Sequence, residues 1–429
     1  MSGVSFLEKL LDGVEVERKA LGSLGNLVRG NGLQKKDFTE TGVPAIHYGQ
    51  IYTYYGLSTI ETKSFVSLDL AKQLKKVDWG NVVITNTSEN LEDVGKALVY
   101  LGERQAVTGG HATILKPGEY LLGKYFAYFT QTEEFASEKR KYAKGTKVID
   151  VSATDMAKIK LPIPCPNNPK KSLEIQAEIV RILDAFTSLT AELTAELTAE
   201  LNTRKKQYNF YRDRLLSFKD TGVEWLPMGQ PDVGKFIRGS SLQKKDFTAT
   251  GIGCIHYGQI YTHYGTHADR TKTYVSKEFF KKARKAKSGD LIIATTSEND
   301  EDVCKAVAWL GNEEIAVSSD ACIYRHNLNA KYVSYFFQTA QFQKQKKPYI
   351  TGTKVRRGNA DNLAKILIPI PSQEEQARIV AILDKFDALT NSITEGLPRE
   401  IELRQKQYEY YRDLLFNFPR PQAPMPATA

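Results

Sequence analysis

The chain has few of the residues that build disulfide scaffolds, zinc ribbons or membrane spans. Its 429 residues include four cysteines, Cys165, Cys254, Cys304 and Cys322, and no two of them form a Cys-x-x-Cys pair. Neither a disulfide framework nor a zinc ribbon is therefore indicated, and we expect a reducing cytoplasm as the compartment. No long apolar run is present, so we expect no membrane-spanning helix. The first residues lack the basic and apolar regions of a secretion signal.

Motifs that carry catalysis are missing or incomplete. Residues 229–235 (GQPDVGK) match a phosphate-binding loop, but Phe236 stands where a Ser or Thr would hold magnesium. His263 and His267 have metal-like spacing, but a glycine lies between them and no glutamate follows the first histidine. The tetrapeptide typical of amino-methyltransferases, Asn-Pro-Pro-aromatic or Asp-Pro-Pro-aromatic, does not occur. A self-sufficient enzyme that modifies or cuts DNA is thus the weaker alternative, and we expect no catalytic residue and no metal site.

The sequence has fewer acidic than basic residues. Lysine and arginine number 59 against 50 aspartate and glutamate residues, which gives a formal net charge of +9 and a sequence pI of about 9.0. An excess of this size favours a polyanionic partner such as nucleic acid, although a generic basic surface would give the same numbers. With 41% hydrophobic and 25% charged residues, the composition is that of a soluble globular protein. The length suggests two or three domains.

What the sequence has instead of these motifs is an internal duplication. LQKKDFT begins at Leu33 and again at Leu242, and IHYGQIYT begins at Ile46 and again at Ile255, in both cases 209 residues further on. TSEN recurs at the same distance, whereas GTKV recurs after 207 residues and QAxIVxILDxF after 200. Such small drifts are typical of insertions and deletions in surface loops. The order along the chain is globular unit, helix, globular unit, helix.

Two long helices are predicted from apolar residues at three- and four-residue spacing over 176–218 and 376–418. Gly396-Leu397-Pro398 is expected to break or kink the second helix. Because each helix has one narrow apolar stripe, we expect the two to pair as an antiparallel coiled coil with pseudo-two-fold symmetry. The alternative is that each helix lies on its own domain.

The globular units are predicted to be α/β (α+β). Residues 81–85 and 290–294 have the pattern of short buried strands bounded by polar turns. Residues 124–132 and 331–339 are predicted to form helices rich in aromatic residues.

The first long helix contains three tandem TAEL units between Thr190 and Leu201. A four-residue unit slightly exceeds the 3.6-residue turn, so Leu193, Leu197 and Leu201 drift slowly around the helix surface. The simpler interpretation is a stable helix, since Ala and Leu are strong helix formers. The sharper interpretation is a spacer of adjustable length with Thr190, Leu193, Leu197 and Leu201 as ruler residues, because losing one unit shortens the helix by ~6 Å.

Four loop-like segments of each copy carry side chains suited to reading DNA. Lysines can neutralise phosphates, a glutamine can offer its amide to adenine, and tyrosines and small polar groups can contact sugar, phosphate or base edges. The candidates of the first copy are Lys35, Lys36, Tyr48, Gln50, Tyr52, Tyr54, Asn86, Ser88, Asn90, Lys144 and Lys147. Those of the second copy are Lys244, Lys245, Tyr257, Gln259, Tyr261, His263, Thr295, Ser297, Asn299 and Lys354. Each one alone has the alternative of a solvated loop or a half-buried tyrosine, but the repetition of the whole set in a basic chain favours DNA.

The alternating units and helices, the QAxIVxILDxF motif, the TAEL repeats and the RKKQYNFYRDRLLSF segment resemble the specificity subunit of type I restriction–modification systems, and most closely the type IC group. The resemblance covers residues 6–418. It implies two target recognition domains, 17–171 and 219–371, two conserved helices, 172–218 and 372–418, and an N-terminal segment, 1–16, that completes a cyclic repeat. The proline-rich tail, 419–429, is expected to be disordered.

The resemblance also implies a function and partners. In that family each recognition domain reads one half of an interrupted DNA target, the helices bind two methyltransferase subunits, and restriction subunits join them. S-adenosylmethionine, ATP and Mg would then serve those partner subunits, with no cofactor in this chain. The remaining alternative is a coiled-coil adaptor that does not touch DNA, which the duplicated basic segments disfavour.

The closeness of the two copies departs from the family, whose recognition domains often differ greatly within one chain. Two similar readers related by a two-fold axis are expected to read similar half-sites on opposite strands, roughly one helical turn apart, so that the target is near-palindromic. Differences at Tyr54 against His263, Asn86 against Thr295 and 109–111 against 319–321 are expected to make the halves unequal.

Overall fold

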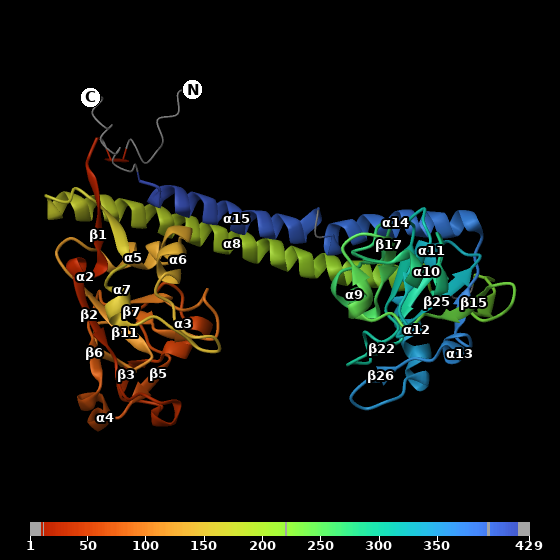
Figure 1. Ribbon diagram of the computed structural model, residues 1–429, viewed down its shortest axis with the longest axis horizontal. Coiled ribbons are helices and arrows are strands. Elements are labelled where there is room, and N and C mark those ends of the chain that lie inside the picture. The colour runs from red at the N-terminus through yellow and green to blue at the C-terminus, as the bar shows by residue number, and fades with distance from the viewer. Residues whose placement is uncertain (1–9, 12, 219–220, 393–394, 419–429) are drawn as a thin grey trace. The chain divides into compact units, whose positions relative to one another are not determined.

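The computed structural model describes residues 10–11, 13–218, 221–392 and 395–418, which divide into two compact units (Figure 1). Unit 1 is drawn from residues 1–193 and 403–429, and unit 2 from residues 194–402. The beginning and the end of the chain thus share one unit. The predicted tail 419–429 and most of the N-terminal segment 1–16 lie outside the described residues. None of the helices described has both the length and the apolar character needed to cross a membrane.

Unit 1 is mixed α/β, as predicted. Its strands are β1 (Val16–Ala20), β2 (Gly25–Arg29), β3 (Val43–Ile46), β4 (Ser58–Thr59), β5 (Ser64–Val66), β6 (Lys75–Val77), β7 (Val82–Thr85), β8 (Thr87–Ser88), β9 (Ala97–Tyr100), β10 (Ala106–Thr108), β11 (Ala112–Pro117), β12 (Ile149–Asp150) and β13 (Lys160–Pro164). Its helices are α2 (Leu21–Leu24), the 3-10 turn η1 (Lys35–Asp37), α3 (Tyr48–Thr53), α4 (Leu68–Gln73), α5 (Gly123–Phe129), α6 (Glu133–Arg140), α7 (Ala153–Met156) and the first part of α8 (Pro169–Leu215). The strands form two main sheets, β2-β11-β7-β9-β4 and β5-β3-β10-β6, and two pairs, β1-β13 and β12-β8.

Unit 2 repeats this design. Its strands are β14 (Trp225–Pro227), β15 (Gly234–Arg238), β16 (Phe247–Thr248), β17 (Ile252–Ile255), β18 (His267–Ala268), β19 (Thr273–Val275), β20 (Lys285–Ala286), β21 (Leu291–Ala294), β22 (Thr296–Ser297), β23 (Ala306–Trp309), β24 (Ile315–Val317), β25 (Ala321–His326), β26 (Arg356–Arg357) and β27 (Leu367–Pro369). Its helices are η2 (Lys244–Asp246), α9 (Tyr257–Thr262), α10 (Lys277–Lys282), α11 (Ala330–Phe337), α12 (Ala340–Lys346), η3 (Lys347–Tyr349), α13 (Ala360–Leu363) and α14 (Gln373–Asn391), and α15 (Gly396–Phe416) follows. The sheets β15-β25-β21-β23-β18 and β16-β19-β17-β24-β20 correspond to those of unit 1.

The predicted strands at 81–85 and 290–294 are confirmed as β7 and β21, each at the centre of a five-stranded sheet. Alternate residues of a strand point to opposite faces, and in β7 they enter two different cores. Val82 and Ile84 join the core that contains α5, whereas Val83 joins the core that contains Ile51 of α3. Both faces of the sheet are therefore covered, which explains why the strand is an uninterrupted apolar run.

The repeated QAxIVxILDxF motif fastens the long helix to the aromatic helix predicted at 124–132 and observed as α5. The side chain of Gln176 accepts a hydrogen bond from the Leu122 amide at 2.9 Å. The carboxylate of Asp184 accepts hydrogen bonds from Lys124 Nζ at 2.8 Å and from the Tyr128 hydroxyl at 2.7 Å. Unit 2 makes the equivalent contacts between α14 and α11, the aromatic helix predicted at 331–339, through Gln376, Asp384, Lys331 and Tyr335. The polar members of the motif are thus anchors, while its apolar members enter the cores.

The predicted antiparallel pairing of the long helices is confirmed by contacts inside each unit. In unit 1 the rings of Phe186 in α8 and Tyr411 in α15 have centroids 5.9 Å apart. In unit 2 the rings of Tyr208 and Tyr211 in α8 lie 6.4 and 5.7 Å from that of Phe386 in α14. Also in unit 1, the hydroxyls of Thr187 in α8 and Tyr408 in α15 are 3.0 Å apart, so the residue number along α15 falls as that along α8 rises and the two helices run in opposite directions. The predicted break is also confirmed, because α14 ends at Asn391 and α15 begins at Gly396, whose φ is +77°.

Each core is completed by the end of a helix that belongs to the other copy of the sequence repeat. Phe416, the last residue of α15, is 1% exposed and lies in the core of unit 1, where its ring centroid is 5.0 Å from that of Tyr125. Leu11 is buried in the same core. At the end of α8, Leu216 is fully buried in the core of unit 2. The repeat is therefore cyclic at the level of packing.

Candidate nucleic-acid interface

The IHYGQIYT segments, predicted to be loop-like, are helices. Residues 48–53 form α3 and residues 257–262 form α9. The physical reason is a capping box that the sequence prediction missed: the His47 ring accepts a hydrogen bond from the Gly49 amide, and the Gln50 side chain accepts one from the His47 amide. These contacts satisfy amides that would otherwise be unpaired at the start of a helix. LQKKDFT is likewise ordered, because Gln34 and Asp37 cap the 3-10 turn η1.

The candidate glutamines are engaged within the fold. The Gln50 amide nitrogen donates to the Ser64 hydroxyl at 2.6 Å while its oxygen serves the capping box. Gln259 repeats both contacts, with Thr273 in the place of Ser64. In the structure, both hydrogen-bonding ends of these amides are therefore used to hold α3 and α9.

The candidate tyrosines connect these helices to the TSEN segments. The Tyr52 hydroxyl donates to the Thr87 carbonyl at 2.6 Å, and Tyr261 donates to the Thr296 carbonyl at the same distance. Burial, as the largest cause, raises the pKa of Tyr52 to about 12, so its hydroxyl keeps the proton that it donates. Tyr48 and Tyr257 are half-buried and lie against His47 and His256, with ring centroids 4.6 Å apart in both pairs.

The lysines of η1 and η2 lie beside the same histidines. Lys35, Lys36, Lys244 and Lys245 are all exposed. Phe38, which follows η1, packs edge-on against His47 with ring centroids 5.6 Å apart. Burial, and next the charge of Lys35, hold the pKa of His47 below its ordinary value. The positive charge beside α3 is therefore carried by Lys35 and Lys36 and not by His47.

The GTKV segments form hairpins that pair with the TSEN strands. β12 pairs antiparallel with β8, and β26 pairs antiparallel with β22. Gly145 has a φ of +102°, and a Cβ there would overlap the Val148 carbonyl oxygen, so the turn requires glycine. Lys147 is exposed at the tip, and Lys354 is exposed at the corresponding tip of unit 2. Lys144 is also exposed and forms an ion pair with Asp155 at 3.0 Å.

The remaining candidates differ in accessibility. Asn86 is fully buried, and its amide oxygen accepts from the Thr113 hydroxyl at 2.8 Å. Asn90 is exposed, but its side chain holds the loop by contacts with Asp93, and Asn299 does the same with Asp302. Tyr54 is 59% exposed beneath Lys63, and His263 is exposed at the end of α9. Ser88, Ser297 and Thr295 are half-buried.

Two residues outside the predicted set, His111 and Asp320, also belong to this face. The His111 ring lies 4.8 Å from that of Tyr48, and its Nδ1 is 3.0 Å from the Thr87 hydroxyl. The backbone N–H of Asn86 donates to the His111 carbonyl at 2.8 Å. The backbone N–H of Thr295 donates to the Asp320 carbonyl at the same distance. His111 therefore corresponds to Asp320, and the pairing of 109–111 with 319–321 was wrong by one residue. The constant 209-residue distance through β10 and β24 was the signal that gives the correct alignment.

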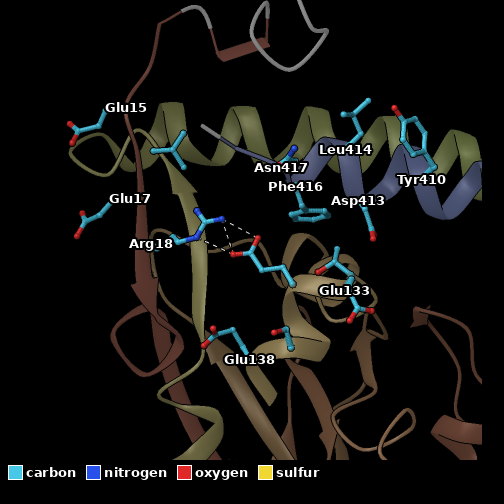
Figure 2. A pocket seen from close by; sticks show the side chains of 14 residues that line it. Glu15, Glu17, Arg18, Glu133, Glu138, Tyr410, Asp413, Leu414, Phe416 and Asn417 are labelled. Atoms are coloured by element: carbon cyan, nitrogen blue, oxygen red, sulfur yellow. Dashed lines mark hydrogen bonds and ion pairs between the residues drawn. The ribbon is translucent and has the colours of Figure 1, made fainter. Parts of the chain in front are cut away.

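A cleft of about 930 Å³ in unit 1 has the opposite character (Figure 2). It lies between β1, α6 and the end of α15, and five of its lining residues are the acids Glu15, Glu17, Glu133, Glu138 and Asp413. Arg18 in its wall is paired with a further acid, Glu134, through two hydrogen bonds of 3.0 Å. An acidic cleft repels phosphate, so this cleft does not suit a nucleic acid. The candidate residues lie instead on the face built from η1, α3, β8 and the β12 hairpin, and on its counterpart in unit 2.

Comparisons of the sequence with a family model and with known proteins point to one family. Residues 13–203 and 222–403 match the family model of the type I restriction modification DNA specificity domain. The chain is 37% identical to the EcoR124I/EcoR124II specificity subunit of Escherichia coli over 98% of this chain and 99% of that protein. It is 32% identical to the EcoprrI specificity subunit of Escherichia coli, over 92% and 93% of the two chains.

Solved structures share the fold at low sequence identity. A chain from a structure of a type I R-M system matches with a TM-score of 0.64 and 14% identity, over 94% of this chain and 97% of that one. The HsdS subunit of Thermoanaerobacter tengcongensis matches with a TM-score of 0.52 and 14% identity, over 94% and 95%. Two α/β units with long helices are thus shared across widely divergent sequences.

Proposed function

The chain belongs to the type I restriction–modification DNA specificity family, and we propose that it is the subunit that selects the DNA target while its partner subunits perform the chemistry. The observation that carries the proposal is the duplicated basic and aromatic face. In both units a lysine-bearing 3-10 turn, a capped helix, a two-residue strand and a lysine-tipped hairpin are joined by direct contacts. Lysines on such a face neutralise phosphates, and polar side chains between them can meet base edges.

Within this proposal, residues 17–171 and 219–371 are the two target recognition domains, and residues 172–218 and 372–418 are the helices that join them. The two domains have corresponding sheets, with one additional short strand, β16, in unit 2, and corresponding capped helices. Similar scaffolds presenting similar side chains favour similar half-sites. We therefore expect a bipartite, near-palindromic target with a non-specific spacer.

The TAEL repeats are proposed to set the length of that spacer. α8 is continuous from Pro169 to Leu215, and the boundary between the two units falls between Leu193 and Thr194, inside the repeats. Deleting residues 198–201 should shorten the helix by ~6 Å and the accepted spacer by about one or two base pairs. An unchanged spacer in the deletion variant would refute the ruler role.

The partners that this function requires are duplex DNA, two methyltransferase subunits and restriction subunits, in the cytoplasm. S-adenosylmethionine, ATP and Mg would be bound by those subunits. The exposed aromatic residues of α15, including Tyr410 and Tyr411, offer an apolar surface to such a partner.

The experiment that tests the function maps methylated adenines in a host that carries this chain with its methyltransferase partners. The expected result is one two-part sequence with a fixed gap. Exchanging residues 17–171 with 219–371 should preserve this sequence almost unchanged. An unrelated sequence after the exchange would refute the near-palindromic target. The absence of salt-dependent duplex binding would favour an adaptor over a DNA reader.

A further inference from the structure

The two recognition faces differ in charge at several corresponding positions, such as Asp150 and Arg357 in the hairpin strands. One of these positions is occupied by His111 in unit 1 and Asp320 in unit 2. Each residue immediately precedes a central strand, β11 or β25, and accepts the same backbone hydrogen bond. The turns before them also match, since the Ala112 amide donates to Gly109 and the Ala321 amide donates to Ser318, both at 3.1 Å. The backbone is therefore the same, and the difference lies in the side chain.

In unit 1 the His111 ring is held by the interface itself. It stacks obliquely on Tyr48 and hydrogen-bonds through Nδ1 with the Thr87 hydroxyl. When Thr87 is the donor in this contact, the neutral ring carries its proton on Nε2. His111 is exposed, so in this tautomer the Nε2–H is available to a ligand.

In unit 2 the carboxylate of Asp320 is not used in this way. The Thr296 hydroxyl, which corresponds to that of Thr87, is buried and has no hydrogen-bond partner. Among the residues that the structure describes, no hydrogen bond or ion pair reaches the Asp320 carboxylate. Its charge does act on His256: burial and next the charge of Lys244 lower the pKa of His256, and Asp320 partly opposes them. Asp320 is half-buried on a face that carries the exposed lysines Lys244 and Lys354.

An unpaired carboxylate on this face has a definite electrostatic consequence. Its charge repels the phosphates of DNA. A hydrogen-bond donor on a base can offset that cost by binding to the carboxylate. In the major groove the donors are the exocyclic amino groups of cytosine and adenine, and carboxylates are the side chains that accept from them. A protonated imidazole nitrogen has the complementary preference for the acceptors of guanine.

We propose that His111 and Asp320 are the specificity-determining residues at which the two half-sites diverge. Asp320 accepts a hydrogen bond from the amino group of cytosine or adenine, and His111 donates one to guanine. The inference rests on the proposed function and adds to it one position in each unit that makes the near-palindrome imperfect.

The test uses the full chain assembled with its methyltransferase partners, and reads the modified sequences genome-wide. In Asp320→His, one base of a single half-site should change from cytosine or adenine to guanine, while the other half-site stays as it was. In His111→Asp the reciprocal change should occur in the other half-site. The preference at the affected base should change by roughly tenfold or more. Glu278→Gln, which alters an exposed acid on α10 outside this face, should leave the sequence unchanged.

A gentler variant keeps the test decisive if Asp320→His fails to assemble. Asp320→Asn preserves the shape of the side chain and should weaken the preference at the same base by roughly tenfold, since the amide also presents a donor. Unchanged base preferences in both His111→Asp and Asp320→Asn would overturn the proposal. An equal rise in affinity of Asp320→Asn for all duplexes would also overturn it, because Asp320 would then act only by repulsion. Failure of the proposed function is separate, since the unaltered complex would then give no two-part sequence.

Discussion

Replacing Phe416 by alanine should unfold the core of unit 1 far more readily than that of unit 2. Phe416 is 1% exposed, and its ring lies 5.0 Å from that of Tyr125 and 5.6 Å from that of Phe129. Removing a buried phenyl ring costs about 3–5 kcal/mol, because the apolar contacts are lost and a cavity remains. The stability of a whole domain is about 5–15 kcal/mol. A side chain close to the end of the chain should therefore supply a large part of the stability of the unit near its beginning.

Hydrogen exchange followed by mass spectrometry measures this effect in each unit separately. In Phe416→Ala the protection of β7 and β11 should fall by about two to three and a half orders of magnitude, as follows from about 3–5 kcal/mol at 1.4 kcal/mol per tenfold. Protection of β21 and β25 in unit 2 should be retained. Sequence-specific methylation should be lost or restricted to one recognisable half-site.

Two further variants control this experiment. Leu216→Ala, at the end of α8, should produce the opposite pattern, with unit 2 weakened by about 2–5 kcal/mol. Tyr410→Ala should leave the protection of both units almost unchanged, because Tyr410 is 64% exposed and its side chain is directed away from the Phe416 ring (Figure 2). Equal loss of protection in both units of Phe416→Ala, or none in either, would refute the view that each core is closed separately by one helix end.

Three further predictions follow from individual contacts. Burial lowers the pKa of Lys139 to about 8, so the charged ammonium weakens the fold below that pH. Stability should rise between about pH 8 and 10, where the unfolded chain binds more protons. When unfolding by denaturant is measured, this rise should be smaller in Lys139→Met, and the remainder should come from Lys346 and Lys305, whose pKa values burial also lowers. Gly145→Ala should distort the β12 hairpin and reduce DNA affinity with little change in melting temperature, whereas Gly56→Ala, whose added methyl meets nothing within 4 Å, should be neutral in the same gel-shift assay. Replacing Lys35 and Lys147 by glutamine should weaken binding to all sequences and lower the slope of log affinity against log salt by about 1 for each lysine that contacts a phosphate.

The helices and central strands were predictable from sequence because their signals are local and repeated. The spacing of apolar residues in 176–218 predicts one buried face, and the structure buries Ile179 and Leu183 completely. The glutamine and the aspartate of the QAxIVxILDxF motif occur in both copies, but the sequence does not show what they contact. Their roles depend on partners more than 50 residues away, such as Leu122 for Gln176 and Tyr128 for Asp184.

The state of the candidate DNA-reading side chains was less predictable because it depends on three-dimensional neighbours. Gln50 has a side chain of the type that binds adenine, yet its amide nitrogen donates to the hydroxyl of Ser64 in β5. Asn86 sits between two short strands in a polar stretch, but the backbone turns its side chain inward to Thr113. Neither contact has a signature in the local sequence, since each depends on how strands pair.

The duplication makes it possible to separate residues that maintain the backbone from residues that determine recognition. Gly95 and Cys304 occupy equivalent positions with φ values of +83° and +69°, so the scaffold imposes a left-handed conformation even where the residue is not glycine. The fold thus tolerates cysteine in place of glycine at this position, although the left-handed backbone is unfavourable for cysteine. At His111 and Asp320 the backbone is equally preserved, but the replaced side chain leaves a buried hydroxyl without its partner in unit 2. A change that gains nothing inside the fold and alters charge on the proposed recognition face is best explained by what that face binds.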